Sequence, residues 1–262
     1  MWGIFSATYA EGRPANLRMD RNKHGTFLST GKTALDPIMI TPDYLRRIAA
    51  WSRELSEREI EVARGGITER SYRAGELIFL HDDQFEYWTG VVSGLVRMSK
   101  VSRSGKAITF TGLTAGAWFG EGTVLKKEPR RYDVEALRDT RLALMEQATF
   151  FWLYENSVAF NRFLVMQLNE RLGQFIGLVE YGRTLDATAR LARSIASLFN
   201  PILYPDVSRH LEVTQEEIGA LTGISRQNAN QCLKRLEKEG LLRLEYGGVT
   251  IVDLDRLRSY GE

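Results

Sequence analysis

Cysteine is nearly absent from this chain, because Cys232 is its single copy among 262 residues. One thiol cannot form an intramolecular disulfide, and it cannot supply the several ligands of a cysteine-bound zinc site or an iron–sulfur cluster. Sensors built on such clusters are therefore excluded. Cys232 falls on the apolar side of a predicted helix, so a buried small side chain is the preferred interpretation and a thiol sensor is the alternative.

Long apolar runs are also missing. Charged residues interrupt every apolar stretch well before the roughly 20 residues that cross a bilayer. The first residues lack the charged start and apolar core of a signal peptide. We therefore expect a cytoplasmic location and no membrane partner. The formal net charge of +2 is too small to indicate nucleic-acid or membrane binding by itself.

Motifs of common enzyme classes are absent as well. The chain has no Walker-type phosphate loop, no nucleophile elbow and no HExxH zinc motif. Its paired carboxylates, such as Glu216 and Glu217, lie on a predicted helix where solvation explains them. The three histidines, His24, His81 and His210, have no ligand-spaced partners, so surface or turn positions are preferred over haem ligation. The sequence thus predicts no catalytic residues, no metal site and no enzyme.

What the chain does contain divides it into segments. Residues 1–40 have no sustained periodicity, and we interpret them as an extension that is flexible or only locally ordered. A solvated tail explains their excess of basic residues more simply than a DNA-binding arm does. Helical spacing is expected over residues 41–66. Over residues 67–146, short β-rich runs separated by turn residues predict a small β-barrel or sandwich.

Two helices should follow the β-rich segment. Ala148–Tyr154 is predicted as a short helix, and Asn156 or Ser157 can cap a second helix that runs to about Tyr181. Apolar residues recur on this second helix every three or four positions, as in a coiled-coil seam. They are Leu164, Leu168, Leu172, Phe175 and Val179. We favour a dimer seam, because a two-fold symmetric protein matches paired DNA half-sites. Packing of the stripe on its own barrel is the alternative.

Residues 214–236, TQEEIGALTGISRQNANQCLKRL, predict two short helices joined by a tight turn. Ile218 and Leu221 line one face of the first helix, Gly223 supplies the freedom that the turn needs, and Ser225 can cap the second helix. The second helix has an inward face at helical spacing. That face is Ala229, Cys232, Leu233 and Leu236.

The other faces of the second helix carry side chains that pair with DNA. Arg can bind guanine, Gln and Asn can bind adenine, and Lys can contact phosphate. The candidate DNA-binding residues are Thr214, Gln215, Ser225, Arg226, Gln227, Asn230, Gln231 and Lys234. Beyond Gly240, a good helix end, LLRLEY and VTIVDL flank a turn at Gly247 and Gly248 and predict the two strands of a wing. An ordinary helical hairpin is the alternative.

Residues 118–134, WFGEGTVLKKEPRRYDV, resemble the phosphate-binding cassette of cyclic-nucleotide-binding domains, in which FGE is followed by a PR pair and, four residues after the Arg, a Val. Residues 185–195, LDATARLARSI, are similar to the helix that links the dimer seam to the DNA domain in the Crp/Fnr family of bacterial transcription regulators. With a barrel, a long helix and a winged helix in that order, the chain resembles this family over about residues 41–262.

The resemblance implies an α+β fold. Residues 41–156 would form a cyclic-nucleotide-binding-like jelly roll, residues 157–183 a dimerisation helix and residues 184–262 a winged helix-turn-helix domain. It also implies a homodimer on a palindromic operator, contact with RNA polymerase, and a switch between two arrangements with a bend near residues 181–184. In the family a Glu commonly stands where this chain has Gln227, so a changed half-site is expected. Target promoters, and activation or repression, stay open.

By motif position, Gly120, Glu121 and Arg130 would hold a cyclic phosphate and a ribose hydroxyl. Backbone amides around a tight Gly turn and one guanidinium bind the phosphate, while a carboxylate accepts from the ribose. Arg131 beside Arg130 adds a second cation. The resemblance therefore implies an effector site for an anionic ligand, with no cofactor that is certain.

The cassette departs from the nucleotide-binding members in two places. Those members have small residues after the Arg, whereas this chain has Arg131 and Tyr132, followed by Asp133. Phe175 and Ile176 stand where cyclic AMP-responsive members offer hydroxyls to adenine, and an unpaired polar edge costs about 1 to 3 kcal/mol. We therefore expect a small anionic effector, such as another nucleotide, in preference to cyclic AMP. An effector-independent regulator and a ligand-binding module acting through protein contacts are the alternatives.

Overall fold

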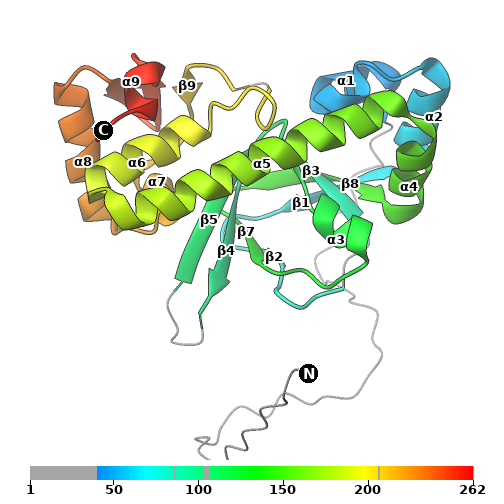
Figure 1. Cartoon of the computed structure of the whole chain (residues 1–262), viewed down its shortest axis with the longest axis horizontal. Coiled ribbons are helices and arrows are strands. Elements are labelled where there is room, and N and C mark those ends of the chain that lie inside the picture. Colours follow the sequence, from blue (N-terminus) through cyan, green and yellow to red (C-terminus); the bar gives the residue numbers. More distant parts are fainter. Residues whose placement is uncertain (1–39, 85–86, 103–106, 206, 262) are drawn as a thin grey trace, which may run out of the picture. The chain divides into compact units, whose positions relative to one another are not determined.

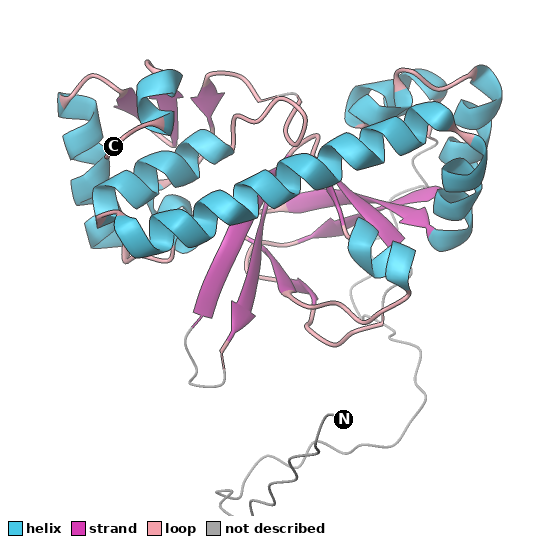
Figure 2. Ribbon diagram, viewed as in Figure 1, coloured by secondary structure: helices cyan, strands magenta, loops and turns pink. Residues whose placement is uncertain are grey.

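The computed structural model describes residues 40–84, 87–102, 107–205 and 207–261. Figures 1 and 2 show its helices and strands. The predictions for the N-terminal extension and for His24 lie outside these residues. The fold class is α+β, as predicted: short helices precede two antiparallel sheets, and further helices with a small three-stranded sheet follow. No helix in the described part of the chain is both long and apolar enough to span a membrane.

The stretch before the first strand is broken, where the sequence predicted one helical stretch. Its pieces are α1 (Pro42–Ile48), η1 (Ala50–Ser52) and α2 (Glu57–Gly65). The helix α1 ends because Ala49 adopts an extended backbone, with φ −140° and ψ 91°. Ser56 then starts α2 afresh, because its side chain accepts from the Glu59 amide while the Glu59 carboxylate accepts from the Ser56 amide. The same helical spacing of apolar residues continues through all three pieces. It therefore predicts helix but does not show where the helix is interrupted.

In the part of the chain that the structure describes, eight strands form two four-stranded antiparallel sheets, with the orders β1-β8-β3-β6 and β2-β7-β4-β5. The strands are β1 (Ile67–Tyr72), β2 (Leu77–Phe79), β3 (Tyr87–Ser93), β4 (Leu95–Val101), β5 (Ala107–Thr114), β6 (Trp118–Phe119), β7 (Asp133–Ala136) and β8 (Thr140–Glu146). The first begins at Ile67 and the last ends at Glu146, the limits predicted from the β-rich runs. Side chains from both sheets, such as Leu142 of β8 and Val96 of β4, are fully buried in one core.

Three more helices in the described part of the chain accompany the sheets. They are α3 (Glu121–Lys126), α4 (Gln147–Asn156) and α5 (Val158–Thr184). Ser157 caps α5, since its hydroxyl accepts from the Phe160 amide at 3.2 Å, so of the two candidate caps Asn156 is excluded. The helix α5 is unbroken over 27 residues and extends beyond the predicted end at Tyr181. Figure 1 shows it leading from α4 towards α6.

A buried aromatic cluster fixes the start of α5 on the first sheet. Trp51 of η1, Trp88 of β3 and Trp118 of β6 meet Phe150 of α4 and Phe160 of α5. The ring centroids of Trp88 lie 4.5 Å from Trp118 and 5.4 Å from Phe160. Aromatic pairs of this kind contribute about 0.5 to 1.5 kcal/mol each beyond the area that they bury. This end of α5 therefore belongs to the core of the sheet domain.

The C-terminal part of the chain is a small helical domain with its own sheet. Its elements are α6 (Ala187–Ser197), β9 (His210–Leu211), α7 (Gln215–Thr222), α8 (Arg226–Lys238), β10 (Leu242–Glu245), β11 (Gly248–Ile251) and α9 (Leu254–Arg258). Asp186 caps α6 by accepting from the Ala189 amide at 2.8 Å. The strand β11 lies between β10 and β9. The predicted wing turn is displaced by one residue, because Gly248 pairs with Glu245 inside the ladder and leaves Tyr246 and Gly247 as the turn.

Candidate DNA-binding surface and effector cavity

The helix pair α7 and α8 has the predicted turn chemistry. Thr214 and Glu217 form a reciprocal capping box at the start of α7. Gly223 ends α7 with φ +68°, a left-handed backbone that glycine adopts without steric cost. Ser225 then caps α8, because its hydroxyl accepts from the Asn228 amide at 3.2 Å. Local sequence signals thus set both ends of the turn.

The helix α8 buries one side and exposes the other. Its predicted inward residues are all at most 7% exposed: Ala229, Cys232, Leu233 and Leu236. Among the candidate DNA-binding residues, the exposed ones are Thr214, Ser225, Arg226, Gln227, Gln231 and Lys234. Gln215 and Asn230 are only half-exposed, and the side-chain oxygen of Asn230 is buried. The exposed candidates on α8 therefore offer one guanidinium, two glutamine amides and one ammonium to a partner.

Cys232 lies inside the C-terminal domain. The Thr188 hydroxyl of α6 donates to its sulfur at 3.5 Å, so the thiol joins α6 and α8. This burial supports the interpretation of Cys232 as a small core residue.

In the described ranges no cluster of His, Cys, Asp or Glu could hold a metal ion. His81 instead lies 2.9 Å from the Asp82 carboxylate, and His210 lies 2.8 Å from the Thr250 hydroxyl.

An apolar stripe runs along the exposed side of α5. The predicted seam residues Leu168, Leu172, Phe175 and Val179 lie on it, with exposed fractions of 40, 58, 36 and 59%. The prediction for Leu164 is wrong: this residue is 3% exposed and packs in the chain's own aromatic cluster. Val165, which is 65% exposed, and Ile176 complete the stripe. We call these six exposed residues the α5 stripe.

A cavity of about 310 Å³ lies between the cassette and α5. Its walls combine Gly120, Glu121 and Tyr132 with three residues of the α5 stripe, which are Leu168, Leu172 and Phe175. Gly120, the residue before α3, has φ +92°, and Glu121 is buried. The cavity is therefore mainly apolar on the α5 side and polar on the cassette side.

The basic side chains of the cassette differ in whether they reach the cavity. Arg131 and Lys126 line the cavity, and both contact the Glu128 carboxylate at 2.9 Å. These two ion pairs lower the pKa of Glu128. Arg130, the expected phosphate ligand, is fully buried and does not line the cavity. The sequence predicted that these residues share one site. The structure shows that Arg131 lines the cavity, whereas Arg130 is buried away from it.

Arg130 is enclosed by aromatic rings. Its guanidinium carbon lies 4.2 Å from the ring centroid of Phe79, 5.7 Å from Phe119 and 5.9 Å from Tyr132. Burial lowers the pKa of Arg130, and the neighbouring Tyr132 phenol and Glu121 carboxylate act against this shift. Burial likewise raises the pKa of Tyr132. Aromatic faces attract a guanidinium, so the enclosure partly offsets its loss of water.

The sheet domain contacts the first helix of the DNA-binding pair. The Arg138 guanidinium, on the turn between β7 and β8, donates to both Glu217 oxygens, at 2.8 and 2.6 Å. The Thr109 hydroxyl donates to the Ala220 carbonyl at 2.9 Å. Leu221 lies against Gly112, where an added Cβ would come within 2.6 Å of the leucine methyl. These contacts link residues more than 70 positions apart, so no local sequence signal indicates them.

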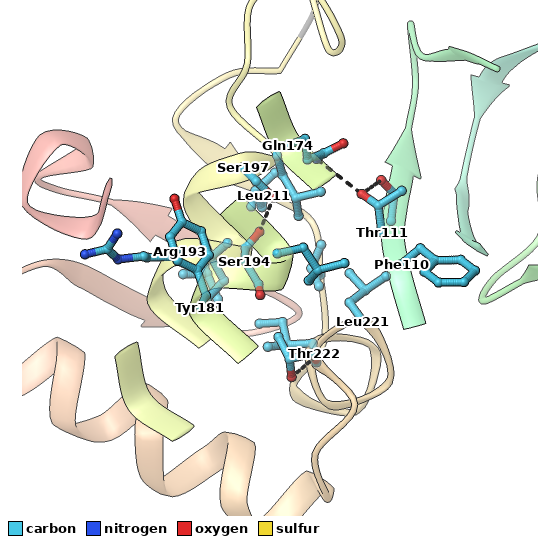
Figure 3. Close-up of a pocket in the computed structure, with 17 residues that line it drawn as sticks. Phe110, Thr111, Gln174, Tyr181, Arg193, Ser194, Ser197, Leu211, Leu221 and Thr222 are labelled. Carbon is cyan, nitrogen blue, oxygen red and sulfur yellow. Dashed lines mark hydrogen bonds between the residues drawn. The ribbon is translucent and has the colours of Figure 1, made fainter. Parts of the chain in front are cut away.

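A small cavity of about 50 Å³ lies beside these contacts, among β5, α5, α6 and α7. Figure 3 shows Phe110 and Thr111 on one side of it and Leu221 and Thr222 on another. Gln174 of α5 donates to the Thr111 hydroxyl at 3.4 Å. This cavity is much smaller than the one at the cassette.

Comparison with known families matches the two parts of the chain separately. Residues 69–157 match the cyclic nucleotide-binding domain, and residues 189–260 match the Crp-like helix-turn-helix domain. The first match includes the cassette and the second includes α7, α8 and the wing. A Crp-like helix-turn-helix domain indicates DNA binding.

Relatives of known function span most of the chain. The transcriptional regulator SdrP of Thermus thermophilus is 29% identical over 180 residues, which are 66% of this chain and 82% of SdrP. The cAMP-activated global transcriptional regulator Vfr of Pseudomonas aeruginosa is 28% identical over 192 residues, 70% of this chain and 87% of Vfr. These relatives are regulators and not enzymes, which confirms the prediction that the chain is not an enzyme.

Solved structures support the same fold. FixK2 from Bradyrhizobium japonicum superposes with a TM-score of 0.60 at 24% identity, over 74% of this chain and 96% of FixK2. A CooA mutant from Carboxydothermus hydrogenoformans gives a TM-score of 0.58 at 21% identity, over 80% of this chain and 92% of CooA. With both domain matches in the order of sensor and then DNA-binding domain, the chain belongs to the Crp/Fnr family of bacterial transcription regulators.

Proposed function

We propose that this protein is a homodimeric, sequence-specific DNA-binding regulator that reads its operator with α8. The observation that carries the proposal is the exposed side of α8, where Arg226 and Gln227 follow directly after the cap at Ser225. In helix-turn-helix proteins the N-terminal residues of the second helix contact base edges in the major groove. Lys234, two turns further along, is placed for a phosphate.

The α5 stripe supports a homodimer. Its six apolar residues are exposed at helical spacing, and exposed contiguous apolar surface marks interaction sites. A second copy of the chain carries an identical stripe, with the same length and spacing. Two parallel helices can pack along such stripes. Two chains would then present two α8 helices to two half-sites of a palindrome.

The larger cavity supports control by a small effector. Three residues of the α5 stripe line it, so an occupant would contact the same helix that meets the partner chain. Arg131 and Lys126 on the cassette side favour an anionic group. Vfr is named as cAMP-activated, but in this chain the apolar residues Phe175 and Ile176 stand where hydroxyls would bind adenine, which disfavours cyclic AMP. We therefore propose an anionic effector other than cyclic AMP.

The switch would use the contacts between the sheet domain and α7. A ligand shifts an equilibrium only if it binds one arrangement better than the other. The contacts of Arg138 and Leu221 hold α7 against the sheet domain in the arrangement described. The end of α5 at Thr184, next to Gly182, is where the second arrangement would bend. As for its family, the setting is the cytoplasm, with RNA polymerase as the further partner.

Selection of binding sites from a random duplex pool tests the proposal. The full-length chain should enrich a palindrome, and the Arg226→Ala, Lys234→Ala double variant should enrich none. Equal enrichment by the double variant would place the DNA contact elsewhere. If neither protein enriches a sequence while the wild type retains its regulatory effect in cells, the chain acts through protein contacts instead.

A further inference from the structure

The phosphate position of the cassette is already filled by the chain itself. Gly120 and Arg130 are the two groups between which a bound phosphate would lie. An added Cβ on Gly120 would meet the two terminal nitrogens of Arg130 at 3.2 and 3.3 Å. The guanidinium thus lies beside the Gly120 backbone, and little space is left between them for a phosphate.

Tyr132 separates Arg130 from the cavity. The Tyr132 side chain lines the cavity, whereas Arg130 is fully buried and lines none of it. The phenol ring lies 5.9 Å from the guanidinium carbon, measured to the ring centroid. Together with Phe79 and Phe119, it completes the aromatic enclosure of Arg130. A ligand in the cavity therefore meets Tyr132 before it can reach Arg130.

The backbone on both sides of Tyr132 is held in place. The Arg130 amide donates to the Asp83 carbonyl at 3.0 Å, and the Asp82 amide donates to the Arg130 carbonyl at 2.8 Å. On the other side, the Asp133 carboxylate accepts from the His81 amide at 2.8 Å. Movement of the backbone would break these bonds, so only side chains are free to open the phosphate position.

We infer that Tyr132 is a specificity-determining residue, which closes the phosphate position of the cassette and excludes cyclic nucleotides from the cavity. This inference rests on the proposed function, because it concerns the effector cavity of that regulator. It narrows the effector class to anions that bind Arg131 and Lys126 at the cavity wall without reaching Arg130. The neighbouring cassette residues Gly120 and Glu121 then keep their fold but not their contact with a cyclic phosphate.

Calorimetric titration of the full-length chain with cyclic AMP and cyclic GMP tests the inference. The wild type should bind neither probe, and Tyr132→Phe, which keeps the ring, should behave in the same way. Tyr132→Ala removes the ring and should bind at least one probe, with an affinity at least about tenfold above the weakest binding that the titration can detect for the wild type, a difference of about 1.4 kcal/mol. Adding Arg130→Gln to Tyr132→Ala should remove the gained binding.

Two outcomes would overturn the inference. One is binding of either probe by the wild type or Tyr132→Phe as tightly as by Tyr132→Ala. The other is no binding by a Tyr132→Ala chain whose circular dichroism matches that of the wild type. Binding of the selected operator is measured on the same samples. If the wild type fails to bind any operator, the proposed function fails, while the nucleotide titration still decides the role of Tyr132.

Discussion

Single side chains on α8 should divide between reading bases and holding phosphates. Arg226→Ala removes a bidentate donor to guanine, so we expect a loss of about 1 to 3 kcal/mol at one base pair of each half-site. Lys234→Ala should weaken binding to all sequences similarly and reduce the salt slope by about one. Fluorescence anisotropy titrations on matched and mutated operators, at several salt concentrations, distinguish the two. Equal loss on every sequence for Arg226→Ala would contradict its assignment.

Gln227 gives a prediction about the preferred base. The neutral amide of Gln prefers adenine, whereas the carboxylate of Glu accepts from cytosine. Gln227→Glu should therefore shift the preferred base pair at one position of each half-site, with the other positions unchanged. Site selection with the two proteins side by side checks this. An unchanged consensus would mean that Gln227 does not contact a base.

Residue-level patterns predicted the buried side of α8 and its exposed candidates except Asn230, because the 3.6-residue period and the Ser225 cap are local properties. They could not predict the burial of Arg130. One residue that encloses it, Phe79, comes from a strand far away in the sequence, and the cassette motif, which includes Phe119, indicates only which residue types occur together. Tertiary packing decides whether a motif arginine faces a ligand or the core.

At the scale of elements, the α5 stripe should control assembly. Leu172→Glu places a charge at the middle of the stripe and should convert the dimer to a monomer, as measured by analytical ultracentrifugation. Met166→Glu is a matched control, because Met166 is also an exposed apolar residue of α5 (47%) but lies outside the stripe. Unchanged dimers with Leu172→Glu, or monomers with both variants, would contradict the seam.

The error at Leu164 has a physical origin at the same scale. Leu164 and Leu168 are one turn apart and share a helical stripe in the sequence, so periodicity cannot separate them. The first part of α5 packs on the sheet domain through Phe160, and this contact also takes Leu164 into the core. The following turns leave the sheet, which exposes Leu168. One apolar periodicity along α5 therefore covers two environments, the core of the sheet domain at Leu164 and the exposed stripe at Leu168.

For the whole molecule, the ion pair of Arg138 and Glu217 predicts a pH-dependent stability. Burial would raise the pKa of Glu217, but hydrogen bonds from Arg138 and Thr214 outweigh it and lower the pKa below its ordinary value near 4.5. A lowered carboxylate pKa in the folded state stabilises the protein above pH 4.5, and this contribution is lost as the pH falls below it. The sheet domain and α7 should therefore separate more readily in acid.

Arg138→Gln should lower the free energy of unfolding by about 1 to 3 kcal/mol at pH 7, as for hydrogen bonds to charged groups. The difference from the wild type should shrink below pH 4.5, where Glu217 takes up a proton. Urea unfolding at pH 7 and below pH 4.5 measures this difference in the free energy of unfolding. Arg258→Gln breaks an exposed pair with Asp255 and should change stability by less than about 1 kcal/mol. A difference that stays constant with pH would contradict the role of Glu217.

Two copies of this chain should read a palindrome with two α8 helices. Footprinting of the selected operator with increasing protein concentration tests this arrangement. We predict two protected half-sites whose centres are one helical turn apart, about 34 Å or 10 base pairs, filled together at two chains per operator. A single protected half-site, or no protected palindrome at any protein concentration, would rule out a dimer that reads a palindrome.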